Sequence, residues 1–470
     1  MEKFIKLAEE RGYQIGAMTV GECIDVATVM GWSFGETAIA EAMLANKMSR
    51  EEVTSAVMDS FCHNLYALDI GLSSGASFLM GQLGRELASG ITLSGDPFVD
   101  KVLRYTLAAQ VGNHSVGLQP CAGTGDACTF TGLTKALTET VEDKETLARL
   151  VAAMLKIGTI FRVGKTTTGC NMEGFGAGAA ATAAVVAEML GGTPEQVGKA
   201  IVLALSPTIG NPCTPRVMVA GLCSTHLGGG VTIGCQSANL AVKTSMPVTV
   251  PPDVMIAMAA AVHPVSAKHI VPVVIHYMEP FFKTHTGVEE YVPADVKQRE
   301  AARIAETQTG ARQEARALSA QANSIVKPFG EAVVGGSSQA VGSPTNAARI
   351  AHFLAKGEIT GVKIELYPEL FARRGINVPG VLMAAVFGAS TDNAQLYREI
   401  MDKVKNAGIT VEMLEVDEPQ LQRITVYAKE QNSMVESFNR GGARLALRSA
   451  SPSKEEALQV ARKLNIDVVG

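Results

Sequence analysis

The chain has 470 residues, of which 47% are hydrophobic, 19% are charged and 5% are aromatic. A chain of this length and apolar content can bury a large core in about two to four domains, which excludes a disordered protein and a small disulfide-stapled scaffold. The 41 Lys and Arg residues nearly balance the 46 Asp and Glu residues, for a net charge of −5. Since no basic block stands out, nucleic acid is not expected as a partner.

The first residues, MEKFIKLAEERGYQIG, are charged and amphipathic, without the basic and then apolar order of a secretory signal. We therefore expect a cytoplasmic protein. The most apolar run, Phe175 to Leu190, is shorter than the roughly 18 to 20 residues of a membrane span. It also contains Glu188. This run predicts a buried helix of small residues, and no membrane partner is expected.

Most of the chain up to about residue 320 shows helical periodicity. Residues 1 to about 90 predict helices separated by glycine and polar breaks. From Pro97 onward the predicted helices are rich in alanine and are interrupted by glycine loops such as GKTTTGCNMEGFGAG and GNPCTPRVMVAGLC. The polar stretch from Lys297 to Ala322 predicts either a solvated helix or a linker, and we place a domain boundary at its end.

After Val326 the pattern changes to short apolar or alternating runs mixed with helical ones. The sequence therefore predicts a mainly α-helical domain with glycine-rich loops over residues 1–322, followed by a smaller α/β (α+β) domain over residues 323–470. The expected strands of the second domain lie in residues 362–371, 409–416 and 423–430, and its expected helices in residues 346–357, 393–408 and 454–465.

Three cysteines of the helical domain, Cys170, Cys213 and Cys223, lie close to glycine or proline. Glycine has no Cβ, so it lets backbone N–H groups approach a thiolate, as the sulfur ligands of an iron–sulfur cluster require. The chain has no C-x-x-C pair, the spacing typical of compact zinc and ferredoxin sites. From spacing alone, three buried small hydrophobic side chains are an equally good interpretation. Cys23 and Cys62 are expected to be core thiols.

Several motifs follow one another in an order that is known from one family. They are GLSSGA at 71–76, LSGD at 93–96, NHSVGL at 113–118, PCAGT at 120–124, GCNME at 169–173, and CTP at 213–215 followed by Cys223. Together they resemble the α subunit, or catalytic domain, of the iron–sulfur-dependent L-serine dehydratases (L-serine ammonia-lyases). GGSSQAVGSPTNAAR at 335–349, VKIELY at 362–367 and SFNRGGA at 437–443 are similar to the β subunit of the same family.

The resemblance implies a fused enzyme in α-then-β order that acts on a small amino acid. Cys170, Cys213 and Cys223 would hold a [4Fe-4S] cluster, and its open iron would be a Lewis acid for the substrate. The implied reaction eliminates water from L-serine to give an aminoacrylate, which hydrolyses to pyruvate and ammonia. A homodimer is the expected assembly. The implied substrate-binding residues are Asn113, Pro120, Cys121, Ala122, Gly123, Thr124, Ser337 and Ser338.

Without the resemblance, the favoured interpretation of PCAGTGD is an ordinary loop whose Thr124 or Asp126 caps the following helix. The resemblance also leaves the fourth iron ligand of a resting cluster open. Cys235, in the segment GCQSAN, is the candidate.

The catalytic base must be sought outside the family's SSSHT motif, because residues 337–341 read SSQAV and contain no histidine. His114 is the candidate, since a neutral imidazole can accept a proton, although a structural histidine is an alternative. Lys165 could bind a carboxylate, and Glu173 could accept hydrogen bonds from an ammonium or anchor its own loop. Two other functions stay open: desulfuration of L-cysteine, and a cluster-binding protein that has lost catalysis.

Overall fold

The computed structural model describes residues 1–73, 75, 77, 80–116, 118, 127–162, 176–210, 222–278, 286–322, 326, 342–389, 393–441 and 443–469. The contacts divide the chain into two compact units, Met1–Ala317 and Leu318–Gly470. This division falls inside helix α15 (Ala294–Gln321). The sequence-based boundary after residue 322 lies at the end of the same helix.

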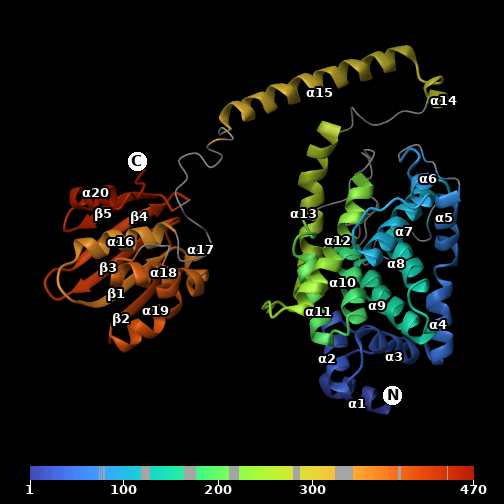
Figure 1. Ribbon diagram of the computed structural model, residues 1–470, viewed down its shortest axis with the longest axis horizontal. Helices are drawn as coiled ribbons and strands as arrows, with labels where there is room; N and C mark the ends of the chain where they lie inside the picture. The colour runs from blue at the N-terminus through green and yellow to red at the C-terminus, as the bar shows by residue number, and fades with distance from the viewer. Residues whose placement is uncertain are drawn as a thin grey trace. The chain divides into compact units, whose positions relative to one another are not determined.

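The first unit is built from helices throughout its described residues, apart from an isolated bridge between Ser77 and Gly81. This confirms the predicted helical domain (Figure 1). In chain order the helices are α1 (Glu2–Arg11), α2 (Val20–Met30), α3 (Phe34–Asn46), α4 (Arg50–Asp59), α5 (Cys62–Ser73), α6 (Leu83–Ala88), α7 (Pro97–Asn113), α8 (Ala127–Thr138), α9 (Lys144–Arg162), α10 (Gly178–Met189), α11 (Pro194–Leu205), α12 (Leu222–Lys243), α13 (Pro252–Met278), α14 (Thr286–Glu289) and α15.

Local sequence sets where several of these helices begin. Thr19, Ser49 and Thr193 each accept a hydrogen bond from the backbone N–H three residues later, and a Glu or Gln at that position bonds back to the capping residue. These capping boxes satisfy backbone donors that the first turn of a helix leaves free. Helices α2, α4 and α11 therefore start at positions that the sequence specifies.

Helix α10 lies at the centre of the first unit, and its residues from Gly178 to Ala187 are buried. Helices α9, α11 and α12 pack around it (Figure 1). Its side chains are mostly alanine and valine, so neighbouring helices can approach on every side. The apolar run that the sequence singled out is thus a buried core helix.

Helices α5 and α7 touch through their backbones. A Cβ added to Gly71 would lie 2.0 Å from the carbonyl oxygen of Ala108, and one added to Gly112 would lie 1.8 Å from that of Ala67. Only glycine fits at such distances, because any larger residue would overlap the facing carbonyl. This contact brings Ser77, which follows α5, close to His114 at the C-terminal end of α7.

The polar stretch predicted as a solvated helix or a linker is helix α15, which has no buried residue. No single helix among the described residues is long and apolar enough to cross a membrane. One helix pair, Pro252–Ser266 with Lys268–Met278, meets the criteria of length and composition jointly, with a bend of 49°.

The second unit is an α/β domain, as the sequence predicts. It contains α16 (Ser343–Leu354), β1 (Ile359–Leu366), α17 (Pro368–Ala372), α18 (Arg374–Phe387), α19 (Ala394–Asn406), β2 (Thr410–Glu415), β3 (Leu421–Ala428), β4 (Ser433–Asn439), β5 (Leu445–Ser451) and α20 (Lys454–Lys463). The strand order is β2-β1-β3-β4-β5, in which β1 and β2 are parallel and the other neighbours antiparallel. The three strands expected from the sequence are β1, β2 and β3.

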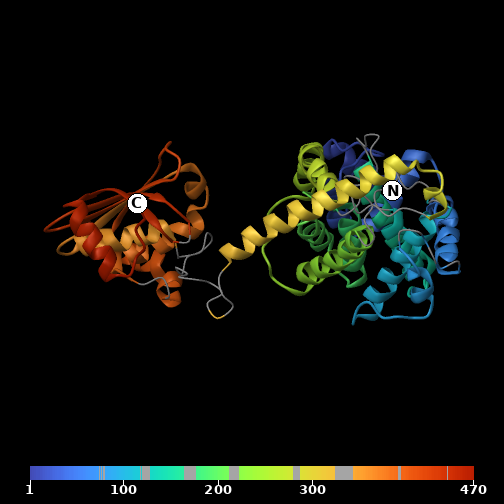
Figure 2. The same ribbon diagram turned by 90° about the horizontal axis from the view of Figure 1, so that it is seen from above.

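Helices α16 and α18 cover one face of this sheet, and Figure 2 shows the strands on one side of the domain and these helices on the other. Strand residues that point toward the helices are apolar, including Val362, Ile364, Ile424, Val426 and Val435. Because side chains alternate along a strand, the residues between them lie on the opposite face. That face carries charged side chains.

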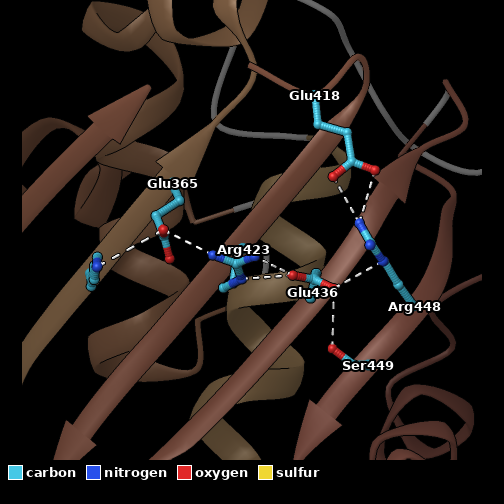
Figure 3. A network of polar contacts seen from close by, with 7 residues as sticks. Glu365, Glu418, Arg423, Glu436, Arg448 and Ser449 are labelled. Carbon is cyan, nitrogen blue, oxygen red and sulfur yellow. Dashed lines mark hydrogen bonds and ion pairs between the residues drawn. The ribbon is translucent and has the colours of Figure 1, made fainter. Parts of the chain in front are cut away.

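These charged side chains form a connected network across β1, β3, β4 and β5 (Figure 3). Arg423 donates to Glu365 Oε1 at 2.9 Å and, through Nε, to Glu436 Oε2 at 2.7 Å. Arg448 lies 3.3 Å from Glu436 Oε1 and donates to both oxygens of Glu418 at 2.8 Å. Glu365 and Glu436 are only 7% and 8% exposed, so their charges depend on these arginines.

Candidate active site

The structure describes a part of the predicted site. His114 and Asn113 are described in full, and Cys223 lies in the first turn of α12, although its side chain is outside the described residues. The described residues contain no group of three or more His, Cys, Asp or Glu side chains arranged to hold a metal ion. The predicted residues outside the described ranges are Pro120, Cys121, Ala122, Gly123, Thr124, Lys165, Cys170, Glu173, Cys213, Ser337 and Ser338.

The helix ends that flank two of the cysteine segments meet at one point. A Cβ built on Gly176 would lie 3.6 Å from Leu205 Cδ2, 3.6 Å from Thr208 Oγ1 and 3.9 Å from Phe161 Cε1. Phe161 lies in the last turn of α9, before the segment with Cys170, and Gly176 follows that segment. Leu205 and Thr208 precede the segment with Cys213. The two segments therefore border one junction of α9, α10 and α11.

His114 caps the C-terminal end of α7 and is held by two side chains. Its Nδ1 lies 3.0 Å from Ser77 Oγ, and its Nε2 lies 3.0 Å from Gln110 Nε2. Ser77 follows α5. The glycine contact between α5 and α7 brings Ser77 close to His114. Gln110 stands one turn before His114 on α7, so both side chains lie on the same face of this helix.

Cys128 on α8 contacts the other end of the Gln110 amide. Its Sγ donates to Gln110 Oε1 at 2.8 Å, which leaves the amide nitrogen of Gln110 facing the imidazole. An amide NH2 group can only donate, so Nε2 of His114 is the acceptor and Nδ1 carries the proton toward Ser77 Oγ. Burial lowers the pKa of His114 below its usual range. Burial therefore favours the neutral form of the imidazole.

These contacts give His114 the protonation state of a general base. They also show that its acceptor nitrogen, Nε2, is already hydrogen-bonded to Gln110. A proton can reach Nε2 only when the amide of Gln110 gives way. Gln110 was not singled out from the sequence, although its position four residues before His114 on a predicted helix is a signal that could have found it.

Asn113 fixes the turn that leads from α7 toward the PCAGT motif. Its Oδ1 accepts a hydrogen bond from the backbone N–H of Leu118 at 2.9 Å. Leu118 is buried, so the turn is anchored at both its start and its end. Asn113, whose side chain was expected to bind substrate, thus forms a hydrogen bond that holds its own loop in place.

Two cysteine interpretations require correction or revision. Cys62 is exposed at the start of α5, so the prediction of a core thiol was wrong, whereas Cys23 is fully buried.

Cys235 lies twelve residues after Cys223 in the continuous helix α12, about 18 Å along its axis at 1.5 Å per residue. Burial also raises the pKa of Cys235 to about 12. Cys235 is therefore too distant to complete the same cluster and stays a thiol.

Comparison with known proteins places these elements in a family. The model of the serine dehydratase alpha chain matches residues 27–279, a range that contains His114 and all three predicted cysteine ligands. The chain therefore belongs to the serine dehydratase alpha-chain family, as its motifs predict. Membership also confirms that it is of the lyase class expected from the sequence.

Two curated relatives share part of the chain. A probable L-serine dehydratase alpha chain from Bacillus subtilis (strain 168) is 25% identical over 225 residues, which cover 44% of this chain and 73% of the relative. The L-serine dehydratase TdcG from Escherichia coli (strain K12) is 29% identical over 142 residues, covering 28% of this chain and 31% of that enzyme. The match thus spans about a third of the E. coli enzyme.

Proposed function

We propose that the chain is an iron–sulfur-dependent lyase that converts L-serine to pyruvate and ammonia. The observation that carries this proposal is the family match over residues 27–279. It includes the segments of Cys170, Cys213 and Cys223, and both relatives are named for L-serine dehydratase activity.

The chemistry of the donor set fits an iron–sulfur cluster, because thiolates are the usual ligands of such clusters. The junction around Gly176 supports the assignment, since it lies beside the segments of both Cys170 and Cys213. Cys223 stands on α12, which packs against α10 and α11. A cluster held there would supply a Lewis-acidic iron for the departing hydroxide of the substrate.

The protein's own groups would handle the proton. In this proposal His114 removes the α-proton of L-serine with Nε2, after the substrate has displaced the Gln110 amide. Ser77 Oγ, which accepts the Nδ1–H bond, would keep the ring in one orientation while its charge develops. Asn113 would hold the turn before the PCAGT motif through its bond to Leu118.

Anaerobic purification followed by analysis for iron, sulfide and pyruvate formation tests the proposal. We expect about four irons per chain, the composition of a [4Fe-4S] cluster, and pyruvate from L-serine. Cys213→Ser should lose iron and activity, whereas Cys62→Ser is the matched control, because Cys62 is exposed and outside the predicted ligand set. Iron at wild-type level and full turnover in Cys213→Ser would contradict the proposal.

The substrate is tested separately by comparing L-serine with L-cysteine. Both would yield pyruvate and ammonia, but only L-cysteine would release sulfide. A strong preference for L-cysteine would retain the cluster assignment and replace the leaving group. No turnover of either amino acid by a cluster-loaded protein would instead favour a member of the family that has lost catalysis.

A further inference from the structure

A cavity of about 320 Å³ lies between α3, α4 and α9, three helices that pack on one another in the first unit. Its lining contains none of the residues predicted for the L-serine site. The volume is at the small end of pockets that hold small molecules in proteins. Its walls are mostly apolar and are formed by Ala38, Ile39, Val53, Val57, Ala152 and Leu155.

A buried ion pair also borders this cavity. Lys156 of α9 lies 2.6 Å from Glu41 Oε2 of α3, and their side chains are only 14% and 6% exposed. The carboxylate of Glu41 is well supplied with donors, because Oε1 also accepts from the backbone N–H groups of Gly16 and Met18 at 3.1 and 2.9 Å. The Cys23 thiol lies 3.7 Å from Oε2.

The ammonium of Lys156 has fewer hydrogen-bond partners than the carboxylate of Glu41. It carries three N–H donors, and among the described residues Glu41 is the acceptor that the structure records for them. A charged donor that is removed from bulk water is costly unless an acceptor faces it. The cavity beside Lys156 is where such an acceptor would fit.

We propose that this cavity binds a short aliphatic monocarboxylate of about three to six carbons, a size suited to pockets of this class. Its carboxylate would accept hydrogen bonds from the free N–H groups of Lys156, and its chain would lie between Ile39 and Leu155. An anion is favoured over a cationic amine because the carboxylate of Glu41 already accepts three hydrogen bonds, whereas Lys156 has donors to spare. A dicarboxylate would place its second charge against mostly apolar walls. The cavity is separate from the site proposed for L-serine, so this inference does not rest on that function.

Binding to the full chain can be measured by calorimetry and by saturation-transfer NMR with 3-methylbutanoate as the probe. The matched probe is 3-methylbutylammonium, which has the same carbon chain and the opposite charge. We expect the carboxylate to bind in the micromolar to millimolar range and the ammonium at least tenfold more weakly. Equal binding of the two probes, or no binding of the carboxylate at millimolar concentration, would overturn the proposal.

Two variants locate the site. Ala42→Leu places a larger side chain in the cavity and leaves the ion pair intact, and Lys156→Met removes the donor. Lys144→Met, at the exposed start of the same helix α9, is the control. We expect Ala42→Leu and Lys156→Met to weaken carboxylate binding at least tenfold and Lys144→Met to leave it unchanged.

Lys156→Met leaves Glu41 buried without its cation and can fail to fold. Ala42→Leu therefore decides the question, provided that its circular dichroism and melting temperature match those of the wild type. Unchanged binding in a folded Ala42→Leu variant would overturn the proposal, as would an equal loss of binding in Lys144→Met.

Discussion

Gln110 of α7 lies one turn before His114, the C-terminal cap of this helix, and its side-chain nitrogen is 3.0 Å from Nε2 of His114. Cys128 on the neighbouring helix α8 bonds to the oxygen of the same amide. The thiol of Cys128 and the imidazole of His114 thus contact opposite ends of one amide, and in this orientation of the amide Nε2 is the acceptor.

Gln110→Glu tests this relationship. A carboxylate beside Nε2 favours the imidazolium, so the pKa of His114, which burial now lowers, should rise. If neutral His114 is the base, activity should be lost at a higher pH than in the wild type as the solution is acidified. Histidine signals in ¹³C-labelled protein report the pKa without reference to turnover.

The control for this experiment is Gln196→Glu, which makes the same chemical change on α11. Glu keeps the capping bond from the Thr193 N–H and loses only the bond to the Val242 carbonyl oxygen. It should leave the titration of His114 unchanged. A His114 pKa that does not move in Gln110→Glu would show that the 3.0 Å contact has no electrostatic consequence.

Gly112→Ala should destabilise the helical unit by about 2 kcal/mol or more, because overpacked cores cost energy and the new Cβ would lie 1.8 Å from the Ala67 carbonyl oxygen. The chain has one tryptophan, Trp32, which packs near Phe4 in this unit, so its fluorescence during urea unfolding is a local measurement. Gly95→Ala is the control, since no atom lies within 4 Å of its added Cβ. Equal stabilities would refute the close helix contact.

Glu188→Gln should stabilise the helical unit at pH 8. Glu188 accepts a bond from the Gly35 N–H at 2.7 Å through Oε1, while its buried Oε2 has no hydrogen-bond partner among the described residues and lies 3.9 Å from Arg149 Nε. Burial raises the pKa of Glu188, so the protonated form favours folding, and this contribution is lost as the pH rises through the folded-state pKa.

Gln keeps the acceptor for Gly35 and removes the buried charge. We expect a gain of about 1 kcal/mol at pH 8, comparable to the cost of an unsatisfied buried polar group, and little change near pH 4.5. Urea unfolding followed by Trp32 fluorescence measures the free energy of unfolding at both pH values. A loss of stability at pH 8 would mean that the attraction to Arg149 outweighs the burial of the carboxylate.

Arg423→Met should destabilise the second unit by about 2 kcal/mol, because it leaves the nearly buried Glu365 and Glu436 without their shared cation. Lys429→Met is the control, since its ion pair with Glu358 is exposed and such pairs contribute under about 1 kcal/mol. Hydrogen exchange of peptides from β3 and β4 measures the stability of this unit alone. Equal protection in both variants would show that the network contributes no more than an exposed pair.

The sequence by itself predicted the architecture of both units, because periodicity follows directly from which face of an element is buried. The run from Phe175 to Leu190 is a clear example, since only a buried helix accommodates so many small apolar residues with one acid. Strands β1, β2 and β3 were found in the same way. Strands β4 and β5 were not, because residues such as Ser437 and Arg448 interrupt their apolar pattern.

Family membership was also within reach of the sequence, since ordered motifs persist when overall identity is low. The contacts of the candidate site were not. Ser77, Gln110 and Cys128 come from three segments, and they meet at His114 only because glycines let α5 and α7 touch and because α8 packs on α7. The cavity beside Lys156 likewise depends on how α3, α4 and α9 pack. Local pattern specifies which face each helix buries, whereas only the packed structure determines which side chains of different helices come within hydrogen-bonding distance.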